Sequence, residues 1–127
     1  MVSDAQTLVM REVTGAEISA FVHSAGRYGG TAQEIARIIE EDRHFILSIG
    51  GVDVLGYSVQ VNGDEFFVSA AAGRSKIDLF KLWHEVASLQ AIGFKSIAFK
   101  TIRRGLIRKS TAAGYVQCKN NVMRKKI

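Results

Sequence analysis

Residues 66–76 combine the residue types that can hold a phosphate group. An apolar run leads through small side chains into a short turn, and a strongly amphipathic helix follows. The turn reads Gly73, Arg74, Ser75 and Lys76. Free N–H groups and the macrodipole at a helix start attract an anion. The sequence therefore predicts a strand, a phosphate-competent turn and a helix in succession.

The C-terminal third also points to anionic partners. The net charge is +5 and the pI is near 9.6, which favours nucleic acid, phosphorylated cofactors or acidic surfaces. Residues 95–127 contain ten Lys or Arg and no acidic residue. Four of these cations, Arg103, Arg104, Arg108 and Lys109, fall on one predicted helix. This basic cluster is either a phosphate-binding surface or a solvated helix face.

The sequence shows no evident nucleophile or metal site. Cys118 is the single cysteine and forms no internal disulfide, which fits a reducing cytosolic setting. No base lies near it in sequence, which favours a packing or surface thiol over a nucleophile. The widely spaced His23, His44 and His84 form no pattern of metal ligands. We expect no metal site.

Composition predicts one globular domain over residues 1–127. The chain is 47% hydrophobic and 23% charged, which is ordinary for such a domain, and it is long enough to bury its own core. No apolar run approaches the length of about eighteen residues that spans a membrane. The N-terminus lacks the basic and apolar segments of a signal peptide. We therefore expect a cytoplasmic protein without a membrane partner.

The N-terminal half reads as a strand, two helices and three strands. Residues 7–13 alternate as a strand, and two capping boxes, Thr14–Glu17 and Thr31–Glu34, each begin a helix. The helices carry apolar stripes at Ile18, Phe21 and Val22 and at Ile35, Ile38 and Ile39. Three antiparallel strands follow at residues 44–49, 54–62 and 65–72, joined by glycine turns at 50–53 and 62–64.

The C-terminal half reads as helix, strand, helix and two short strands. A third capping box, Ser75–Asp78, begins an amphipathic helix that Gly93 closes. Its stripe reads Leu79, Leu82, Trp83, Val86 and then Leu89 or Gln90. Residues 96–101 form a strand, and this strand, helix, strand order requires a right-handed crossover between parallel strands. A helix over about 102–113 and two strands flanking a turn at 119–121 complete the chain.

The predicted order β-α-α-β-β-β-α-β-α-β-β resembles the fold of the GNAT superfamily of acyltransferases. The resemblance covers nearly the whole chain. Residues 90–99 (QAIGFKSIAF) look like the family's helix-to-strand passage, Gly114-Tyr115 matches its Gly-Phe pair, and residues 122–127 (VMRKKI) look like its last strand. It implies a single α/β domain with a mixed, mostly antiparallel sheet flanked by helices.

The resemblance implies a binding site for acetyl-CoA. In this family the fourth and fifth strands, here 65–72 and 96–101, splay apart around the pantetheine arm, which bonds to backbone amides. The pyrophosphate lies on the loop before the third helix, here residues 73–78, and the fourth helix borders the adenosine phosphates. The cofactor-binding residues implied are Val68, Ser69, Ala70, Gly73, Arg74, Ser75, Lys76, Arg103, Arg104 and Arg108.

The resemblance also implies two catalytic candidates. The family often places a base or water-orienting carboxylate on the fourth strand, where this chain has Glu65. Because Glu65 follows the turn at 62–64, a solvated turn carboxylate is the alternative. The family's usual general acid is a tyrosine four residues before the glycine of the Gly-Phe pair. Ser110 stands there, and a hydroxyl of this type is a much poorer proton donor.

The phosphate turn departs from the family pattern Arg/Gln-x-x-Gly-x-Gly/Ala. Ala72, Ser75 and Ile77 take its defining positions. Ile77 brings a β-branched side chain to the point where pyrophosphate approaches, and Asp78 adds a carboxylate near the same amides. We therefore expect weak CoA affinity that depends strongly on salt.

Three functions agree with these features. The first is an acyl-CoA-dependent N-acyltransferase, in which an unidentified amine attacks the thioester, an amide near Val68 or Ser69 polarises its carbonyl, and water or Glu65 accepts a proton. The second is a catalytically degenerate GNAT-like module, resembling the compact proteins that phages and prophages encode; the altered turn and Ser110 favour it. The third is a nucleic-acid-binding domain that uses the basic C-terminal third. A homodimer is among the assembly states considered.

Overall fold

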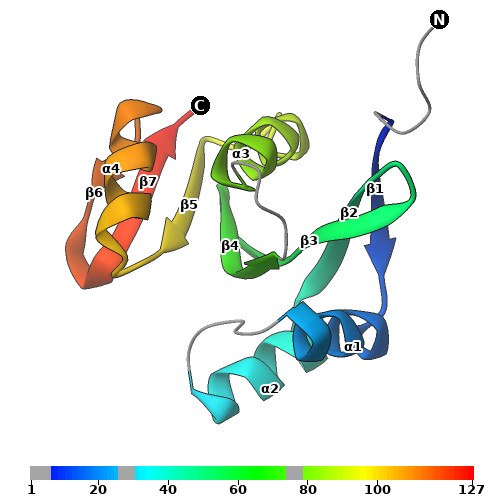
Figure 1. Cartoon of the computed structure of the whole chain (residues 1–127). Helices are drawn as coiled ribbons and strands as arrows, with labels where there is room; N and C mark the ends of the chain where they lie inside the picture. Colours follow the sequence, from blue (N-terminus) through cyan, green and yellow to red (C-terminus); the bar gives the residue numbers. More distant parts are fainter. Residues whose placement is uncertain (1–6, 26–30, 74–78) are drawn as a thin grey trace, which may run out of the picture. The chain divides into compact units, whose positions relative to one another are not determined.

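The computed structural model describes residues 7–25, 31–73 and 79–127 of the chain. Its elements are β1 (Leu8–Val13), α1 (Gly15–Ala25), α2 (Ala32–Glu41), β2 (Arg43–Ile49), β3 (Val52–Asn62), β4 (Glu65–Gly73), α3 (Leu79–Gln90), β5 (Ser96–Lys100), α4 (Arg104–Ala112), β6 (Val116–Gln117), a 3₁₀ turn (Lys119–Asn121) and β7 (Val122–Lys126) (Figure 1). The predicted order β-α-α-β-β-β-α-β-α-β-β is confirmed.

The strands form one seven-stranded sheet in the order β1-β2-β3-β4-β5-β7-β6. β1 and β2, β5 and β7, and β6 and β7 pair antiparallel, whereas β4 and β5 are parallel. The helix α3 connects the two parallel strands, as a crossover must. The predicted mixed, mostly antiparallel sheet is confirmed.

Contacts group the chain into two compact units. The N-terminal unit comprises Met1–Ser58 and Ala70–Leu79, and the C-terminal unit comprises Val59–Ser69 and Phe80–Ile127. The strands β3 and β4 each contribute residues to both units. A single domain over the whole chain stays a prediction.

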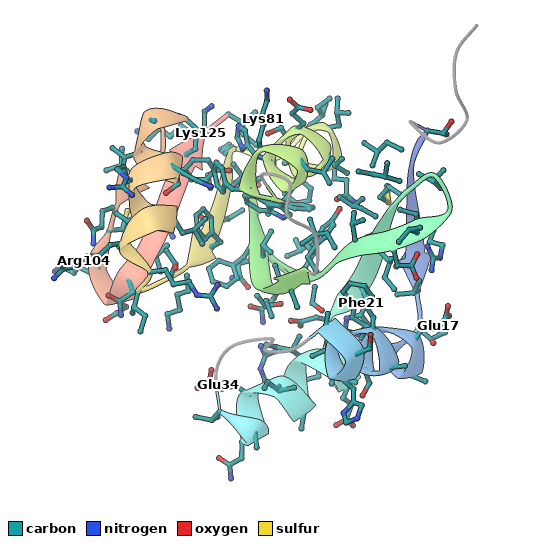
Figure 2. The ribbon with its side chains drawn as sticks, in the orientation of Figure 1. Glu17, Phe21, Glu34, Lys81, Arg104 and Lys125 are labelled. Carbon is teal, nitrogen blue, oxygen red and sulfur yellow. The ribbon has the colours of Figure 1, made fainter. Side chains whose placement is uncertain are left out.

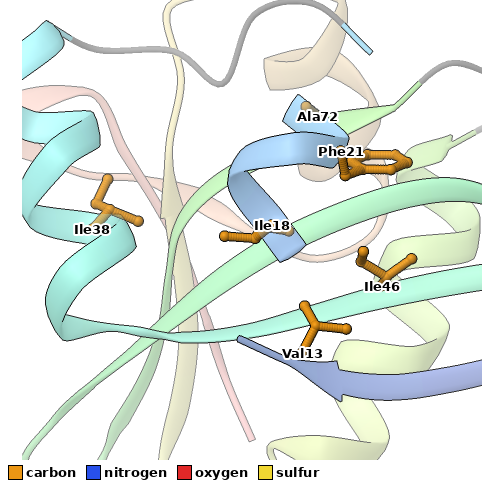
Figure 3. Close-up of a cluster of buried hydrophobic side chains, with 6 residues drawn as sticks. All are labelled: Val13, Ile18, Phe21, Ile38, Ile46 and Ala72. Carbon is orange, nitrogen blue, oxygen red and sulfur yellow. The ribbon is translucent and has the colours of Figure 1, made fainter. Parts of the chain in front are cut away.

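The N-terminal unit has an apolar core that joins its helices to its strands (Figure 3). The buried members are Val13, Ile18, Phe21, Ile38, Ile46 and Ala72. Ile18 and Phe21 project from α1, and their spacing places them on one helix face. Val22, Ile35 and Ile39 pack against this core. The predicted apolar stripes of both N-terminal helices are therefore confirmed.

Local hydrogen bonds begin the two N-terminal helices where the sequence predicts. The Thr14 hydroxyl oxygen accepts the Glu17 N–H at 3.2 Å, and the Glu17 carboxylate accepts the Thr14 N–H at 3.2 Å. This reciprocal pair is a complete capping box. The Thr31 hydroxyl oxygen accepts the Glu34 N–H at 3.2 Å, so it caps α2 in the same manner.

The first hairpin turn is shorter than predicted. The strand β3 begins at Val52, two residues before the expected start, because Gly50 and Gly51 make the turn alone. Their φ angles of 58° and 81° suit a two-residue turn of type I′. The second turn follows the prediction, with Gly63 at φ 62°.

In the C-terminal unit, aromatic side chains pack α3 onto β5. Trp83 is buried, and its ring centroid lies 5.4 Å from that of Phe99 in an edge-on arrangement. Tyr115, which follows α4, contacts Phe99 at the same centroid distance. Of the two residues predicted to continue the stripe of α3, Leu89 is 69% exposed and does not, whereas Gln90 is half-buried. The capping box at Ser75–Asp78 lies outside the described residues.

Positive φ angles end the helices of the C-terminal unit as predicted. Gly93 and Gly114 have φ of 99° and 98°, just after α3 and α4. Asn120 and Asn121 have φ of 61° and 62° and make the last turn. Asparagine tolerates this conformation better than other side chains. None of the described helices is long and apolar enough to cross a membrane.

Candidate functional site

The candidate site centres on the pairing between the parallel strands β4 and β5. The pairs run from Glu65 and Ser96 to Val68 and Phe99. The pairing then stops, although β4 continues to Gly73 and β5 to Lys100. Within the described residues, the strands therefore pair over the first four positions only. We call residues 65–69 of β4 with β5 the β4–β5 fork.

The open end of the fork is the strand edge that follows Val68 and Phe99. Among the described residues, no further pair of β4 with β5 follows these two. Val68 and Phe99 are both buried. An extended ligand with amide groups matches such a strand edge, because it can take the place of a missing strand. The predicted splay concerns the separation of the strands beyond these pairs, and it stays a prediction.

Glu65 lies at the closed end of the fork, where its side chain bonds to residues of β5 and β7. The Ser96 hydroxyl donates to the Glu65 Oε1 at 2.9 Å. The Arg124 guanidinium donates to both carboxylate oxygens, from Nε to Oε1 and from Nη2 to Oε2, the latter at 3.0 Å. The Glu65 side chain is 14% exposed. The alternative of a solvated turn carboxylate is therefore wrong.

These contacts also fix the charge of Glu65. The hydrogen bonds from Arg124 lower the pKa of the carboxyl, although partial burial opposes this effect. A carboxylate with a lowered pKa is a weak proton acceptor near neutral pH. A catalytic base at this position is still a prediction, but the geometry does not favour it.

Ser110 lies on the buried side of α4, with no exposed surface. Its hydroxyl donates back to its own helix, to the carbonyl of Leu106 at 2.8 Å or of Ile107 at 3.0 Å. A hydroxyl held in this way is not presented to a leaving thiolate. The predicted role of Ser110 as a proton donor is therefore not favoured in this conformation.

Two members of the basic cluster, Arg103 and Arg104, lie at the start of α4, and Arg108 and Lys109 lie further along it. Arg103 is the N-cap residue and makes no side-chain cap bond, and the first turn holds no acidic residue. Arg103, Arg104 and Arg108 are exposed, and Figure 2 shows Arg104 directed away from the helix. Among the described residues, no salt bridge joins these three cations to a carboxylate. Cations at a helix N-terminus oppose its dipole, so an anion at this point would relieve an unfavourable arrangement.

Comparisons with known proteins place this geometry in a known fold. No protein-family model and no curated protein matches the chain. A GNAT family acetyltransferase from Elizabethkingia anophelis with acetyl-CoA bound superposes with a TM-score of 0.70 at 8% identity, over 94% of this chain and 98% of that one. The chain has the GNAT fold.

Other acetyltransferase structures agree. One from Thermus thermophilus superposes with a TM-score of 0.66 at 14% identity, over 98% of this chain and all of that one. The PaiA N-acetyltransferase from Thermoplasma acidophilum, in complex with coenzyme A, gives 0.60 at 9% identity, over 96% of this chain and all of that one. At such low identities, these superpositions establish the GNAT fold alone. The chemistry has to be argued from the site.

The remaining predicted site residues of this GNAT fold divide into two groups. Ala70 and Gly73 lie on the last part of β4, in the N-terminal unit, where Ala70 packs against the core. Arg74, Ser75 and Lys76 lie outside the described residues. Among the described residues, no group of His, Cys, Asp and Glu could hold a metal ion.

The sequence did not reveal a polar pair between α3 and the segment after α4. The Tyr115 hydroxyl and the His84 Nδ1 lie 3.0 Å apart, and the His84 ring stacks on Phe80 at 5.7 Å. Burial first, and the charge of Lys125 second, lower the pKa of His84, while burial raises the pKa of Tyr115. The Tyr115 hydroxyl therefore donates a hydrogen bond to Nδ1 of a neutral His84 imidazole. The only sequence signal was the aromatic residue after Gly114.

Proposed function

We propose that this protein is an acyl-CoA-dependent N-acyltransferase that transfers acetyl from acetyl-CoA to an amine. The partial pairing of β4 and β5, which stops at Val68 and Phe99 in a GNAT fold, carries this proposal. The similar structures from Elizabethkingia anophelis and Thermoplasma acidophilum contain acetyl-CoA and coenzyme A, respectively. The open strand edge and the unpaired arginines fit the two halves of such a ligand, an amide-bearing arm and phosphates.

Each candidate residue has a defined part in this proposal. The backbone at Val68, Ser69 and Ala70 binds the amide-bearing arm. The predicted phosphate turn at residues 73–76 is the candidate for the pyrophosphate. Arg103, Arg104 and Arg108 bind the remaining phosphates by charge.

Acetyl-CoA supplies a thioester carbonyl that an unprotonated amine can attack. A backbone N–H near Val68 or Ser69 polarises that carbonyl. The new C–N bond forms as the C–S bond breaks, and the amine loses a proton while the thiolate gains one. Because Glu65 is held by Arg124 and Ser110 by its own helix, water accepts and supplies these protons.

Titration calorimetry with acetyl-CoA and CoA tests binding before any acceptor is known. We expect binding that weakens as salt rises, because exposed charges are screened. An Arg104→Ala/Arg108→Ala variant should lose about tenfold in affinity, because two exposed charge pairs contribute about 0.2–1 kcal/mol each and tenfold corresponds to about 1.4 kcal/mol. Lys95→Ala is the matched control, because Lys95 is an exposed cation in the same unit that already pairs with Asp64 at 3.5 Å.

Thiol release from acetyl-CoA in the presence of a panel of small amines, peptide N-termini and lysyl peptides then tests transfer. Turnover with at least one amine is expected. No heat on titration and no thiol release would overturn the proposal.

A degenerate GNAT-like module is the second candidate. The observation that favours it is that both candidate catalytic side chains, Glu65 and Ser110, are engaged inside the protein. This candidate predicts CoA binding with no thiol release for any amine. A nucleic-acid-binding role has less support, because the exposed large apolar side chains of the described residues are all aliphatic and offer no stacking surface.

A further inference from the structure

Three strands of the C-terminal unit meet at one carboxylate. Glu65 is the first residue of β4, Ser96 is the first residue of β5, and Arg124 lies on β7. Ser96 and Arg124 both donate to Glu65. The strand β5 lies between β4 and β7 in the sheet. Glu65 therefore joins β4 to its neighbour β5 and also reaches beyond it to β7.

The contacts of Glu65 with Ser96 and Arg124 lie at the closed end of the fork, where they can restrain the separation of its strands. Glu65 and Ser96 are the first pair of β4 with β5, and Val68 and Phe99 are the last. Three residues of strand separate the two ends, or about 10 Å at roughly 3.3 Å per residue. A restraint at the closed end of a short fork limits how far the open end separates, because strands do not bend sharply over so few residues.

We infer that Glu65, Ser96 and Arg124 form a clamp that holds the closed end of the β4–β5 fork and so sets the strand separation at Val68 and Phe99. Glu65 is then a positioning residue and not a catalytic base. The inference rests on the proposed function only in naming the arm of acetyl-CoA as the ligand of the fork.

The contacts favour a clamp over a base. Both carboxylate oxygens accept hydrogen bonds from Arg124, and one also accepts from Ser96. An accepting base needs a free lone pair directed at the substrate, whereas a restraint needs charged, two-point contacts between different strands. Arg124 is 40% exposed, so solvent can stabilise its charge if Glu65 is removed, and the variants below are expected to fold.

Glu65→Gln tests the clamp, with Asp64→Asn as its matched control. Asp64 is the preceding carboxylate, and its pair with Lys95 is exposed on both sides. In Glu65→Gln, amide hydrogen exchange at the paired residues of β4 and β5 should quicken at least about fivefold, while β1 and β2 stay unchanged. The affinity for acetyl-CoA, by calorimetry, should fall at least about fivefold, the lower end of typical coupling between sites. Asp64→Asn should change neither.

A second ligand distinguishes a positioning role of Glu65 from a general destabilisation of the protein by Glu65→Gln. Adenosine 3′,5′-bisphosphate carries the 3′-phosphate and the inner 5′-phosphate of CoA without the amide-bearing arm. Its affinity, by NMR titration, should be the same in Glu65→Gln as in the unaltered protein, because it does not enter the fork. Equal losses for both ligands would overturn the clamp.

Exchanging the charges gives the rescue. Glu65→Arg/Arg124→Glu restores an ion pair between β4 and β7, and it should recover at least half of the lost acetyl-CoA affinity on a logarithmic scale. Unchanged amide exchange and acetyl-CoA affinity in Glu65→Gln would overturn the clamp outright. If the unaltered protein binds no acetyl-CoA, the proposed function fails, while the exchange measurement on the fork still decides the clamp.

Discussion

Ser110→Ala tests whether Ser110 acts as a proton donor. Its place in the sequence implies that role, whereas its hydroxyl is bonded within α4. The substitution removes one hydroxyl from a fully buried site on α4. The lost bond to the Leu106 carbonyl costs about 1 kcal/mol net. That carbonyl is not left without a partner, because the helix backbone bonds it as well. Alanine is also the better helix former, by about 0.5 kcal/mol. The free energy of unfolding should therefore change by less than about 1 kcal/mol.

Urea denaturation at pH 7 measures this change, with Thr111→Ala as the matched control. Thr111 makes the same bond to a carbonyl four residues earlier, at 2.7 Å to Ile107, but on the exposed side of α4. Thiol release from acetyl-CoA, with an amine found in the panel, should be unchanged in Ser110→Ala. A proton donor in the reaction is worth roughly a hundred- to ten-thousand-fold in rate. A loss of that size, with stability preserved, would refute the reasoning and restore Ser110 as the acid.

Three further perturbations check the packing and charges. Gly56→Ala should destabilise the protein by about 1–3 kcal/mol. The added Cβ would lie 2.8 Å from Phe21 and 2.9 Å from Ile18 in the core of the N-terminal unit. A neutral effect in urea denaturation would contradict this packing. Gly105→Ala, where a Cβ meets nothing, should instead stabilise α4 by up to about 1 kcal/mol in the same assay. The lowered pKa of Glu65 means that its ion pair contributes above the unfolded pKa of about 4.3 and is lost as pH falls through the lower folded pKa. The difference in unfolding free energy between the unaltered protein and Glu65→Gln should therefore shrink between pH 6 and pH 3, and a constant difference would count against it.

The sequence predicted the elements of the fold because the signals for them are local. Capping boxes join residues three apart, and Thr14 with Glu17 forms one as predicted. Glycines at turns need only their own backbone freedom, and Gly114 ends α4 where expected. The length of the first turn was wrong, since sequence alone did not show that Gly50 and Gly51 would be sufficient without the next two residues.

The elements that carry the candidate site residues could be predicted from the sequence, but the hydrogen-bond partners of these residues could not. The resemblance to the GNAT superfamily implies Glu65 and Ser110 as candidates, and they lie on β4 and α4. The partners of Glu65 lie 31 and 59 residues further along the chain, at Ser96 and Arg124. Which side chains meet across strands depends on register, and a shift of one residue would turn each side chain to the opposite face. No pattern within one segment carries that information.

The hydrogen bonds of Glu65 and Ser110 limit which catalytic effects are available to this protein. A carboxylate held by Arg124 and a hydroxyl held by its helix offer little acid or base catalysis. In the proposed reaction, the remaining effects are the orientation of an already reactive thioester and one backbone donor at its carbonyl. Correct placement of two reactants is worth up to about 7–11 kcal/mol, more than a typical general acid or base supplies. A site that works by placement depends on the separation of its two strands, and the clamp at Glu65 acts on that separation. The pH dependence of transfer then belongs to the acceptor, because only an unprotonated amine can attack.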